Sequence, residues 1–421
     1  MKVTTILLFI LVFLFSGCNG QSGRKKPLTL ATAINKPTET LSKPTYNIYL
    51  ENSGSMDGYV EGVTEFEQAV YNFLVDIKIN SLTDSLNLYY INSKLIPNPP
   101  DVKDFIEKLE PNTFKIKGGI RASTDISEMF KDILRNTNAN CVSIFISDCV
   151  FSPGNGQDAQ YYLQNQQIGL KGNFASKLGQ INLTTVVMQL SSKFDGNYFN
   201  QLNQPTKINA QRPYYIWLIG KHDYIVDLFD KVKKENFKGS GVQNFYCAYN
   251  STKSFEYGLL TSPKLGYYDR DKSSPKNKII NAEKSDKGTR KGEFQFSVGV
   301  NLKSSLLDDK YILDPKNYAI PSNYSIEIVK NSIANYNYTH ILKLTTRLLK
   351  TENISIQLKN NLPQWVTELN SDNDIHINTP EQLGKTFGIK YLVEGIYEAY
   401  KAKKNIKEKD TFLEINISVN Q

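Results

Sequence analysis

The sequence has few of the residues from which transition-metal sites and hydrolase active sites are usually built. Its 421 residues include three His and four Cys, and the histidines lie far apart, without the spacing of metal ligands. It has no His-Glu-x-x-His motif, no Cys-x-x-Cys pair, no phosphate-binding glycine loop and no Gly-x-Ser-x-Gly elbow. These absences argue against a zinc enzyme and a serine hydrolase, although a catalytic triad assembled across the fold stays open.

The sequence has no strong excess of basic residues and, beyond its N-terminus, no long apolar run. The net charge of +8 results from 50 Lys and Arg against 42 Asp and Glu, and these charges are scattered along the chain. Because nucleic-acid binding usually needs clustered basic residues, we expect no nucleic-acid partner. No run after residue 18 is apolar and long enough to be a membrane helix.

Three of the four cysteines lie beyond the N-terminal segment, which is an odd number for an oxidising compartment. Cys141 and Cys149 stand at the two ends of one expected strand, about 26 Å apart at about 3.3 Å per residue, which is too far for a disulfide. We expect buried free thiols, with a Cys149–Cys247 bridge as the alternative.

Residues 1–18 are expected to be a targeting segment that is not part of the fold. Lys2 precedes an apolar stretch, Ile6 to Phe15, that is short for a bilayer span, and small residues lead to Cys18. This segment resembles a bacterial lipoprotein signal, which implies that Cys18 carries a lipid; an ordinary secretory signal is the alternative. We therefore expect a lipid-anchored membrane protein of the bacterial cell envelope, at the periplasmic face of the outer membrane, with residues 19–44 as a flexible tether.

From residue 45 to residue 235 strand-like and helix-like segments alternate, which predicts an α/β domain with a doubly wound, mostly parallel sheet. Ligands of such sheets bind beyond the carboxyl ends of the strands. The expected strands are 46–50, 86–92, 142–147, 182–190 and 214–219, and the expected helices are 63–77, 101–109, 126–134 and 223–232.

From residue 240 to residue 421 short alternating runs dominate, which predicts a mainly β, sandwich-like C-terminal domain. One helix, over 387–400, is expected to interrupt it. The stretch 267–293 is rich in Lys, Asp, Ser and Gly and is expected to be a mobile loop.

Candidate ligand residues follow two of the expected strands. The first strand ends in Glu51, and a tight loop with Ser53 and Ser55 comes next. A carboxylate and two hydroxyls on one bend supply the oxygen ligands that hard divalent cations prefer. The strand over 142–147 also leads to an acid, Asp148.

This arrangement resembles the von Willebrand factor type A domain, whose metal-ion-dependent adhesion site opens with Asp-x-Ser-x-Ser and is completed by a Thr and an Asp from later loops. The resemblance implies a divalent cation, Mg, Mn or Ca, bound by Glu51, Ser53, Ser55, Thr124 and Asp148. It also implies a binding module without enzymatic activity, in which a carboxylate of a protein partner completes the coordination of the ion. The alternatives are a metal-assisted hydrolase and a structural envelope component with a metal-free relic of the site.

Two residues depart from the family's pattern. Glu51 is one methylene longer than the usual Asp and would displace the ion by about 1 Å or require another rotamer, so Mn or Ca should be tolerated better than Mg. Cys149 stands where the family usually has Gly, and its side chain narrows the backbone path.

Several other acids have a plainer interpretation. Asp57 is expected to form a turn, with a water-mediated contact to the metal as the alternative, and Asp125 is expected to cap the helix that follows it. Four further acids lack the Gly and the distal Glu of an EF-hand loop and are expected to be solvated: Asp269, Asp271, Asp372 and Asp374.

Overall fold

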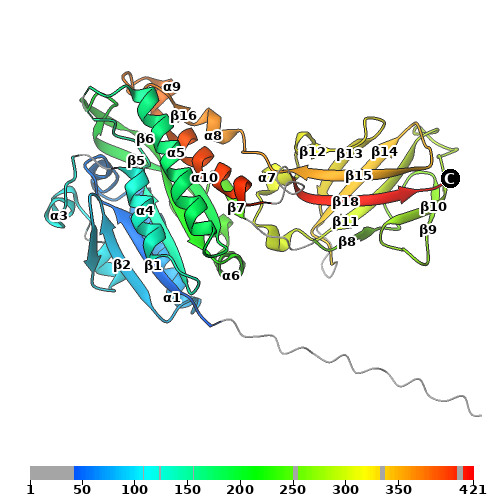
Figure 1. Cartoon of the computed structure of the whole chain (residues 1–421), viewed down its shortest axis with the longest axis horizontal. Helices are drawn as coiled ribbons and strands as arrows, with labels where there is room; N and C mark the ends of the chain where they lie inside the picture. Colours follow the sequence, from blue (N-terminus) through cyan, green and yellow to red (C-terminus); the bar gives the residue numbers. More distant parts are fainter. Residues whose placement is uncertain are drawn as a thin grey trace, which may run out of the picture. The chain divides into compact units, whose positions relative to one another are not determined.

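The computed structural model describes residues 42–421 except 108, 123–124, 155, 250–254, 332–336 and 405–410. The expected signal segment, its Cys18 and residues 19–41 of the expected tether lie outside the described residues. Among the helices that are described, none is both long and apolar enough to cross a membrane. Two hydrophobic cores organise the chain, a larger one in an α/β body and a smaller one between two antiparallel sheets (Figure 1).

The α/β body is built on a seven-stranded sheet with the order β3-β2-β1-β4-β6-β5-β7. Its strands are β1 (Thr45–Glu51), β2 (Leu86–Ile91), β3 (Leu95–Asn98), β4 (Cys141–Ser147), β5 (Thr184–Phe199), β6 (Pro205–Gly220) and β7 (Asn244–Tyr249). β1 pairs in parallel with β2 and β4, whereas β6 pairs antiparallel with both β4 and β5. The α/β class is therefore confirmed, but the sheet is mixed. β5 runs in the same direction as β1 and β4.

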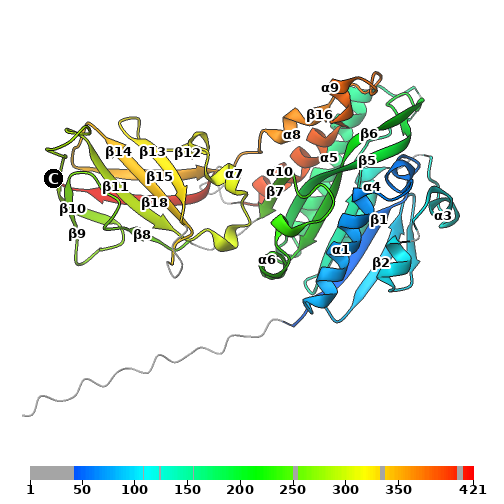
Figure 2. The ribbon, with the colours of Figure 1, turned by 180° about the vertical axis from the view of Figure 1, so that it is seen from behind.

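Helices cover both faces of this sheet (Figures 1 and 2). α1 (Glu65–Ile79) lies on one face, and α4 (Ile126–Asn136), α5 (Ala159–Leu178) and α10 (Ile389–Lys403) lie on the other. α1 begins with a capping box, in which the Thr64 hydroxyl accepts a hydrogen bond from the Glu67 N–H and the Glu67 carboxylate accepts one from the Thr64 N–H. The shorter helices of the body are η1 (Ser55–Tyr59), α2 (Val102–Ile106), α3 (Pro111–Ile116), α6 (His222–Lys231) and η2 (Lys234–Asn236).

The helix α5 was not expected from the sequence. It begins at the N-cap Asp158, whose carboxylate accepts a hydrogen bond from the Tyr161 N–H. Its buried residues lie three to four positions apart, at Leu163, Gln166, Leu170 and Phe174, but polar residues and two glycines separate them. A narrow apolar stripe of this kind predicts a helix only weakly.

β5 and β6 form a hairpin that is much longer than the two strands predicted from their apolar runs. Pairing extends from Thr184 opposite Gly220 to Phe199 opposite Pro205. Because β5 runs parallel to β1 and β4, the tip of this hairpin projects from the edge at which those two strands end. A Cβ atom at Gly58 would collide with the Phe194 ring, so the hairpin packs closely on η1.

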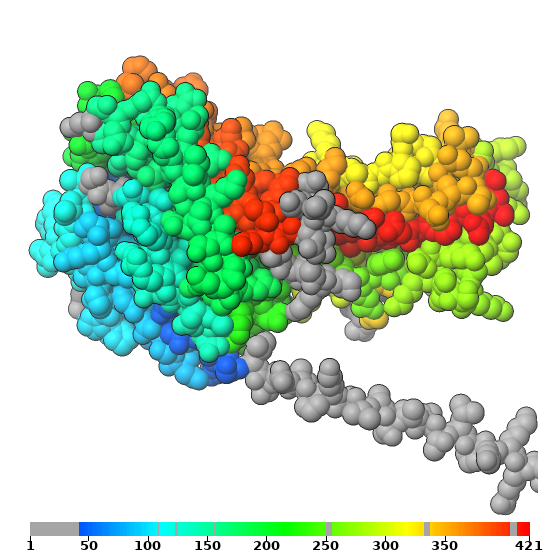
Figure 3. Space-filling model, viewed as in Figure 1, coloured from blue at the N-terminus to red at the C-terminus, as the bar shows by residue number. Residues whose placement is uncertain are grey.

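The α/β body includes segments beyond the predicted range of 45–235. β7 pairs with β5 at the sheet edge, and the later helices α8 (Trp365–Glu368) and α10 contribute buried side chains to the same core. In the space-filling view α10 lies directly against α5 (Figure 3). The fit is close, because a Cβ atom at Gly395 of α10 would stand 2.7 Å from the Gln167 carbonyl oxygen.

Nine of the remaining strands form two mainly antiparallel sheets around the smaller core, as the sandwich-like prediction requires, and β16 (Asn370–Ser371) and β17 (Thr386–Phe387) form a separate two-stranded sheet. One sheet has the order β12-β15-β18-β10-β9 and the other β13-β14-β11-β8. Their bounds are β8 (Tyr257–Leu259), β9 (Tyr267–Arg270), β10 (Lys278–Glu283), β11 (Phe294–Val300), β12 (Tyr318–Ala319), β13 (Ser325–Lys330), β14 (His340–Thr346), β15 (Glu352–Lys359) and β18 (Thr411–Val419). One pair, β10 with β18, is parallel.

The prediction of a mobile loop over 267–293 was wrong. This stretch contains β9 and β10, which pair with each other. Tyr268, Ile279 and Ala282 are buried in the smaller core. The polar residues that suggested a loop alternate with these inward side chains or lie in the connections.

Candidate functional site

The two predicted carboxylate ligands meet at the carboxyl edge of the sheet. β1 and β4 are parallel neighbours with Leu50 opposite Ile146, so Glu51 is level with Ser147 and Asp148 follows one residue later. Both side chains are buried, at 1% and 2% exposure. The Ser147 hydroxyl donates a hydrogen bond to Glu51 Oε2.

The serine loop after β1 joins the same cluster. Ser53 Oγ and Ser55 Oγ lie 2.9 Å apart and share a hydrogen bond. Ser55 also hydrogen-bonds Asp148. The structure thus places four of the five predicted ligands at this edge, with Ser53, Ser55 and Asp148 linked to one another and Glu51 bonded to Ser147. The fifth, Thr124, lies outside the described residues.

Burial dominates the electrostatics of this edge. It raises the pKa of Asp148 above its ordinary value, although hydrogen bonds from the Val150 N–H and Ser55 and the charge of Arg212 oppose the shift. A nearby cation would favour the ionised form of such a carboxyl. Among the described residues no three His, Cys, Asp or Glu side chains converge, so an ion at this edge would also need the serine hydroxyls.

Asn52, between the acid and the first serine, holds the surrounding loops together. It is fully buried, and its Oδ1 accepts a hydrogen bond from Asn92 Nδ2 at 3.0 Å. Asn92 Nδ2 also donates to the Gly118 carbonyl at 2.8 Å. Next to it, Gly119 has a φ of 80°, and a Cβ atom there would collide with the Asn92 side chain. The loops after β1, β2 and α3 are therefore fixed relative to one another.

A cavity of about 270 Å³ opens above the serine loop. Gly54 lies between two of its walls, with the Arg121 carbonyl on one side and the Phe199 ring on the other, each 3.6 Å from where a Cβ atom would stand. The lining residues come from the serine loop, the segment before α4, the loop after β4 and the hairpin tip: Ser53, Gly54, Ser55, Arg121, Ala122, Val150, Ser152, Phe199 and Asn203. Glu51 and Asp148 are buried and do not line it.

Arg121 fixes the serine loop from the cavity side. Its Nε donates to the Asn52 carbonyl at 2.7 Å and its Nη2 to the Ser53 carbonyl at 2.9 Å. Nη2 also pairs with the Asp57 carboxylate. Burial raises the pKa of Asp57, while this ion pair opposes the shift. Asp57 lies in the turn η1, as expected. Its carboxylate is held by Arg121, a residue for which the sequence predicted no role.

The prediction that Asp125 caps a helix is confirmed. Asp125 is the N-cap of α4, and its carboxylate accepts a hydrogen bond from the Glu128 N–H at 3.1 Å. The other carboxylate oxygen accepts one from Gln166 Nε2 of α5 at 3.2 Å. The capping residue therefore also ties α4 to its neighbouring helix.

A buried arginine, also missed from the sequence, lies close enough to influence Asp148. Arg212 on β6 is 1% exposed. Its Nη1 donates to the Leu383 carbonyl at 2.9 Å, and its guanidinium carbon lies 4.7 Å from the Tyr198 ring centroid. In the sequence, Arg212 directly precedes the apolar run Pro213 to Ile219, and this position is the signal that could have indicated that the arginine is buried.

Asp374 was predicted to be solvated, and this was wrong. It is fully buried, because its loop folds onto the hairpin tip. It accepts hydrogen bonds from the Tyr198 hydroxyl at 2.6 Å and from the Gln201 N–H at 2.8 Å. Burial raises its pKa, and Arg212 is among the groups that oppose this. The charge of Arg212 therefore acts on both Asp148 and Asp374.

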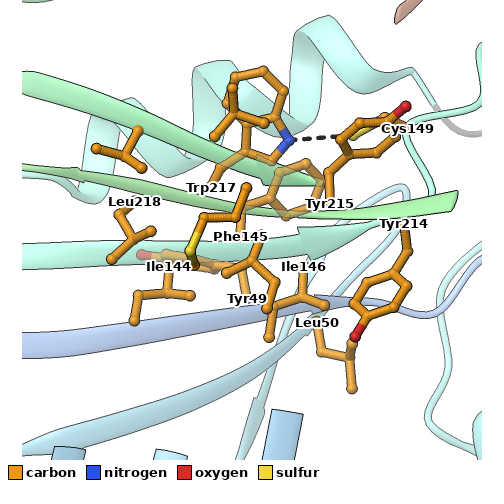
Figure 4. Close-up of a cluster of buried hydrophobic side chains, with 14 of the residues drawn as sticks. Tyr49, Leu50, Ile144, Phe145, Ile146, Cys149, Tyr214, Tyr215, Trp217 and Leu218 are labelled. Carbon is orange, nitrogen blue, oxygen red and sulfur yellow. Dashed lines mark hydrogen bonds between the residues drawn. The ribbon is translucent and has the colours of Figure 1, made fainter. Parts of the chain in front are cut away.

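Cys149 adopts the backbone conformation that the glycine of the resembled family would favour. Its φ is 55°, in the left-handed region that side chains disfavour. The indole Nε1 of Trp217 donates a hydrogen bond to its Sγ at 3.2 Å, which Figure 4 shows beside Tyr215 and Phe145. Burial raises the pKa of this thiol. All three described cysteines, including Cys247, are buried and free, as expected.

No protein-family model, curated protein or solved structure matches this chain. The resemblance to the von Willebrand factor type A domain therefore remains a prediction from the three loop motifs.

Proposed function

We propose that this protein is a lipid-anchored module of the bacterial cell envelope that binds a protein partner through a divalent cation. The observation that carries the proposal is the pair of buried carboxyls, Glu51 and Asp148, at the ends of adjacent parallel strands, followed by a loop whose Ser53 and Ser55 line a cavity. We assign these four residues, with Thr124, as the ligands of the ion.

The donor set fits a hard cation. It consists of carboxylate and hydroxyl oxygens, which Mg, Mn and Ca prefer. A bound divalent ion would supply a coordination position for a carboxylate of the partner. The residues of this chain hold the ion and position the cavity walls.

A second candidate uses the same cavity without an ion. The Glu51 carboxylate already accepts a hydrogen bond from Ser147, and Ser55 already bonds Asp148. These contacts would satisfy a relic site in which partner recognition depends on the cavity walls alone. The two candidate functions differ in the effect of a chelator on partner binding: it should abolish binding through an ion and leave metal-free binding unchanged.

Capture of a partner from envelope extracts, with and without a chelator, tests the proposal. We expect the full chain to retain a protein that EDTA releases and that added Mn or Ca restores. Asp148→Asn keeps the size of the side chain and should remove this capture, whereas Asp227→Asn, an exposed acid on α6, should leave it unchanged. Equal capture in EDTA would reject the ion-bridged mode and favour the metal-free one.

A further inference from the structure

One arginine contacts three consecutive peptide groups of the serine loop. Arg121 Nε donates to the Asn52 carbonyl at 2.7 Å, and its Nη2 donates to the Ser53 carbonyl at 2.9 Å. The Gly54 N–H in turn donates to the Arg121 carbonyl at 3.0 Å. The backbone that carries Ser53 and Ser55 is therefore held by one residue that is remote in the sequence.

These contacts are shorter than the hydrogen bonds that the loop makes within itself. The Met56 N–H reaches the Ser53 carbonyl at 3.3 Å, and the Asp57 N–H reaches the Gly54 carbonyl at 3.4 Å. Because N–H···O hydrogen bonds are usually about 2.7–3.2 Å long, these two are weak and η1 alone constrains the loop little. Arg121 supplies the stronger constraint.

Asp57 holds the guanidinium in this position. Its carboxylate pairs with Arg121 Nη2, and the two side chains are 21% and 14% exposed. Asn52 precedes the two serines and Asp57 follows them, so the guanidinium joins the start of the loop to its end. Three acceptors around one planar group suit arginine, whereas the ammonium of lysine is a compact point charge without a rigid fork of donors.

The two hydroxyls on this backbone lie at a spacing that suits a small ion. Ser53 Oγ and Ser55 Oγ are 2.9 Å apart. In an octahedron with metal–oxygen distances of about 2.0–2.1 Å, as for Mg, neighbouring oxygens are about 2.9 Å apart, whereas the longer distances of Ca require about 3.3–3.7 Å. A loop that cannot widen therefore favours Mg over Ca, which opposes the effect of the longer Glu51.

We propose that Arg121 is a positioning residue of the cation site, which holds the hydroxyls of Ser53 and Ser55 together and thereby limits the size of the ion that the site accepts. Arg121 is not itself a ligand, because a guanidinium is always protonated and offers no acceptor atom. The inference rests on the proposed function for the ion. It does not rest on it for the loop, because the contacts of Arg121 with the loop need no ion.

Calorimetric titration of the full chain in detergent with Mg and with Ca tests the effect on ion size. Arg121→Lys keeps the positive charge but loses the fork. We expect the affinity for Mg to fall at least about tenfold and the affinity for Ca to fall less, so that their ratio shifts towards Ca by about threefold or more. Arg121→Gln, which also removes the charge, should shift the ratio in the same direction. A gain in affinity for both ions in Arg121→Gln would show that Arg121 acts by repelling the ion and would overturn the inference.

Hydrogen exchange of the metal-free protein gives a second measurement, which does not depend on an ion. The amides of residues 53–57 should exchange at least about tenfold faster in Arg121→Lys, whereas those of β1 and β4 should be unchanged. Asp57→Asn keeps an oxygen acceptor but removes the charge that holds the guanidinium. It should give a smaller change in the same direction, and it tests the inference even where Arg121→Lys does not fold.

The matched control is Arg135→Lys, the same substitution in an exposed ion pair with Asp132 on α4. It should change neither the exchange of the loop nor the affinity for either ion. Unchanged exchange of residues 53–57 in Arg121→Lys, or equal losses of affinity for Mg and Ca, would overturn the inference. If the wild type binds neither ion while its loop responds to Arg121→Lys as expected, the proposed function fails and the positioning role of Arg121 stands.

Discussion

Replacement of Arg212 by Met would test whether this guanidinium compensates the buried carboxyls. The change keeps most of the aliphatic volume but removes the charge that acts on Asp148 and Asp374. It also removes the hydrogen bond to the Leu383 carbonyl and the contact with the Tyr198 ring. Loss of one partner from a buried charge cluster typically costs about 3–5 kcal/mol.

That cost can be translated into a melting temperature. With an unfolding entropy of about 2.1 cal/mol/K per residue, the roughly 380 residues from Ser42 onwards give about 0.8 kcal/mol/K if they unfold as one unit. A loss of about 4 kcal/mol then lowers the melting temperature by about 5 °C. The decrease is larger if the α/β body unfolds separately, because the entropy change is smaller.

Urea unfolding followed by tryptophan fluorescence is the suitable assay, because both tryptophans, Trp217 and Trp365, belong to the core of the α/β body. Asp374→Asn, combined with Arg212→Met, should recover at least about 1 kcal/mol by removing one uncompensated charge. The control Lys231→Met breaks an exposed pair with Asp227 and should cost no more than about 0.5 kcal/mol. A loss below about 1 kcal/mol in Arg212→Met, or no recovery in the double variant, would refute the reasoning.

Three further predictions concern the α/β body. Cys149→Gly should be at least as stable as Cys149→Ala in urea unfolding, because Gly adopts the left-handed φ of this position without backbone strain. If Gly instead costs about 0.5–1 kcal/mol relative to Ala, as in an ordinary helix or strand interior, the backbone at this position is not strained. Burial raises the pKa of Glu67 to about 7, so the folded state binds this proton more tightly than the unfolded state does. The free energy of unfolding should therefore fall by about 1 kcal/mol, after solvent screening, as the pH rises from about 4.5 to about 7. The same dependence of stability on pH in Glu67→Gln would contradict this. A fragment of residues 45–235 lacks β7 and α10 and should show no cooperative thermal transition by circular dichroism; a sharp transition would show that both are dispensable.

The sequence predicted best where one local pattern determines an element. α1 and α4 have strong apolar stripes and caps at Thr64 and Asp125, and β2 and β4 have apolar runs of strand length. Three features depend on contacts between segments that are distant in the sequence. They are the distal half of the β5–β6 hairpin, the membership of β7 and α10 in the larger core, and the pairing of the strands within 267–293. Hydrophobic periodicity carries no information about such pairing.

The same distinction applies to the site. Glu51 and Asp148 could be predicted to meet, because the carboxyl ends of neighbouring parallel strands share one edge. The roles of Arg121, Arg212 and Asp374 could not be predicted, because each contacts a segment that is remote in the sequence. Arg121 contacts the serine loop, Arg212 the Leu383 carbonyl, and Asp374 the hairpin. Asp374 looks like a loop acid in the sequence, and only the folding of its loop onto Tyr198 and Gln201 buries it.

The most direct test of the central claim is the melting temperature of the full chain with added Mg, Mn or Ca. At a hundredfold excess over Kd a bound ion stabilises the folded state by about 2.7 kcal/mol, which corresponds to about 3 °C for a unit of roughly 380 residues. We predict this rise for the wild type, at least as large with Mn or Ca as with Mg, its loss in Asp148→Asn, and stronger Mg binding in Glu51→Asp. Absence of a rise with all three ions, in both the wild type and Glu51→Asp, would contradict the claim that this edge of the sheet holds a metal ion.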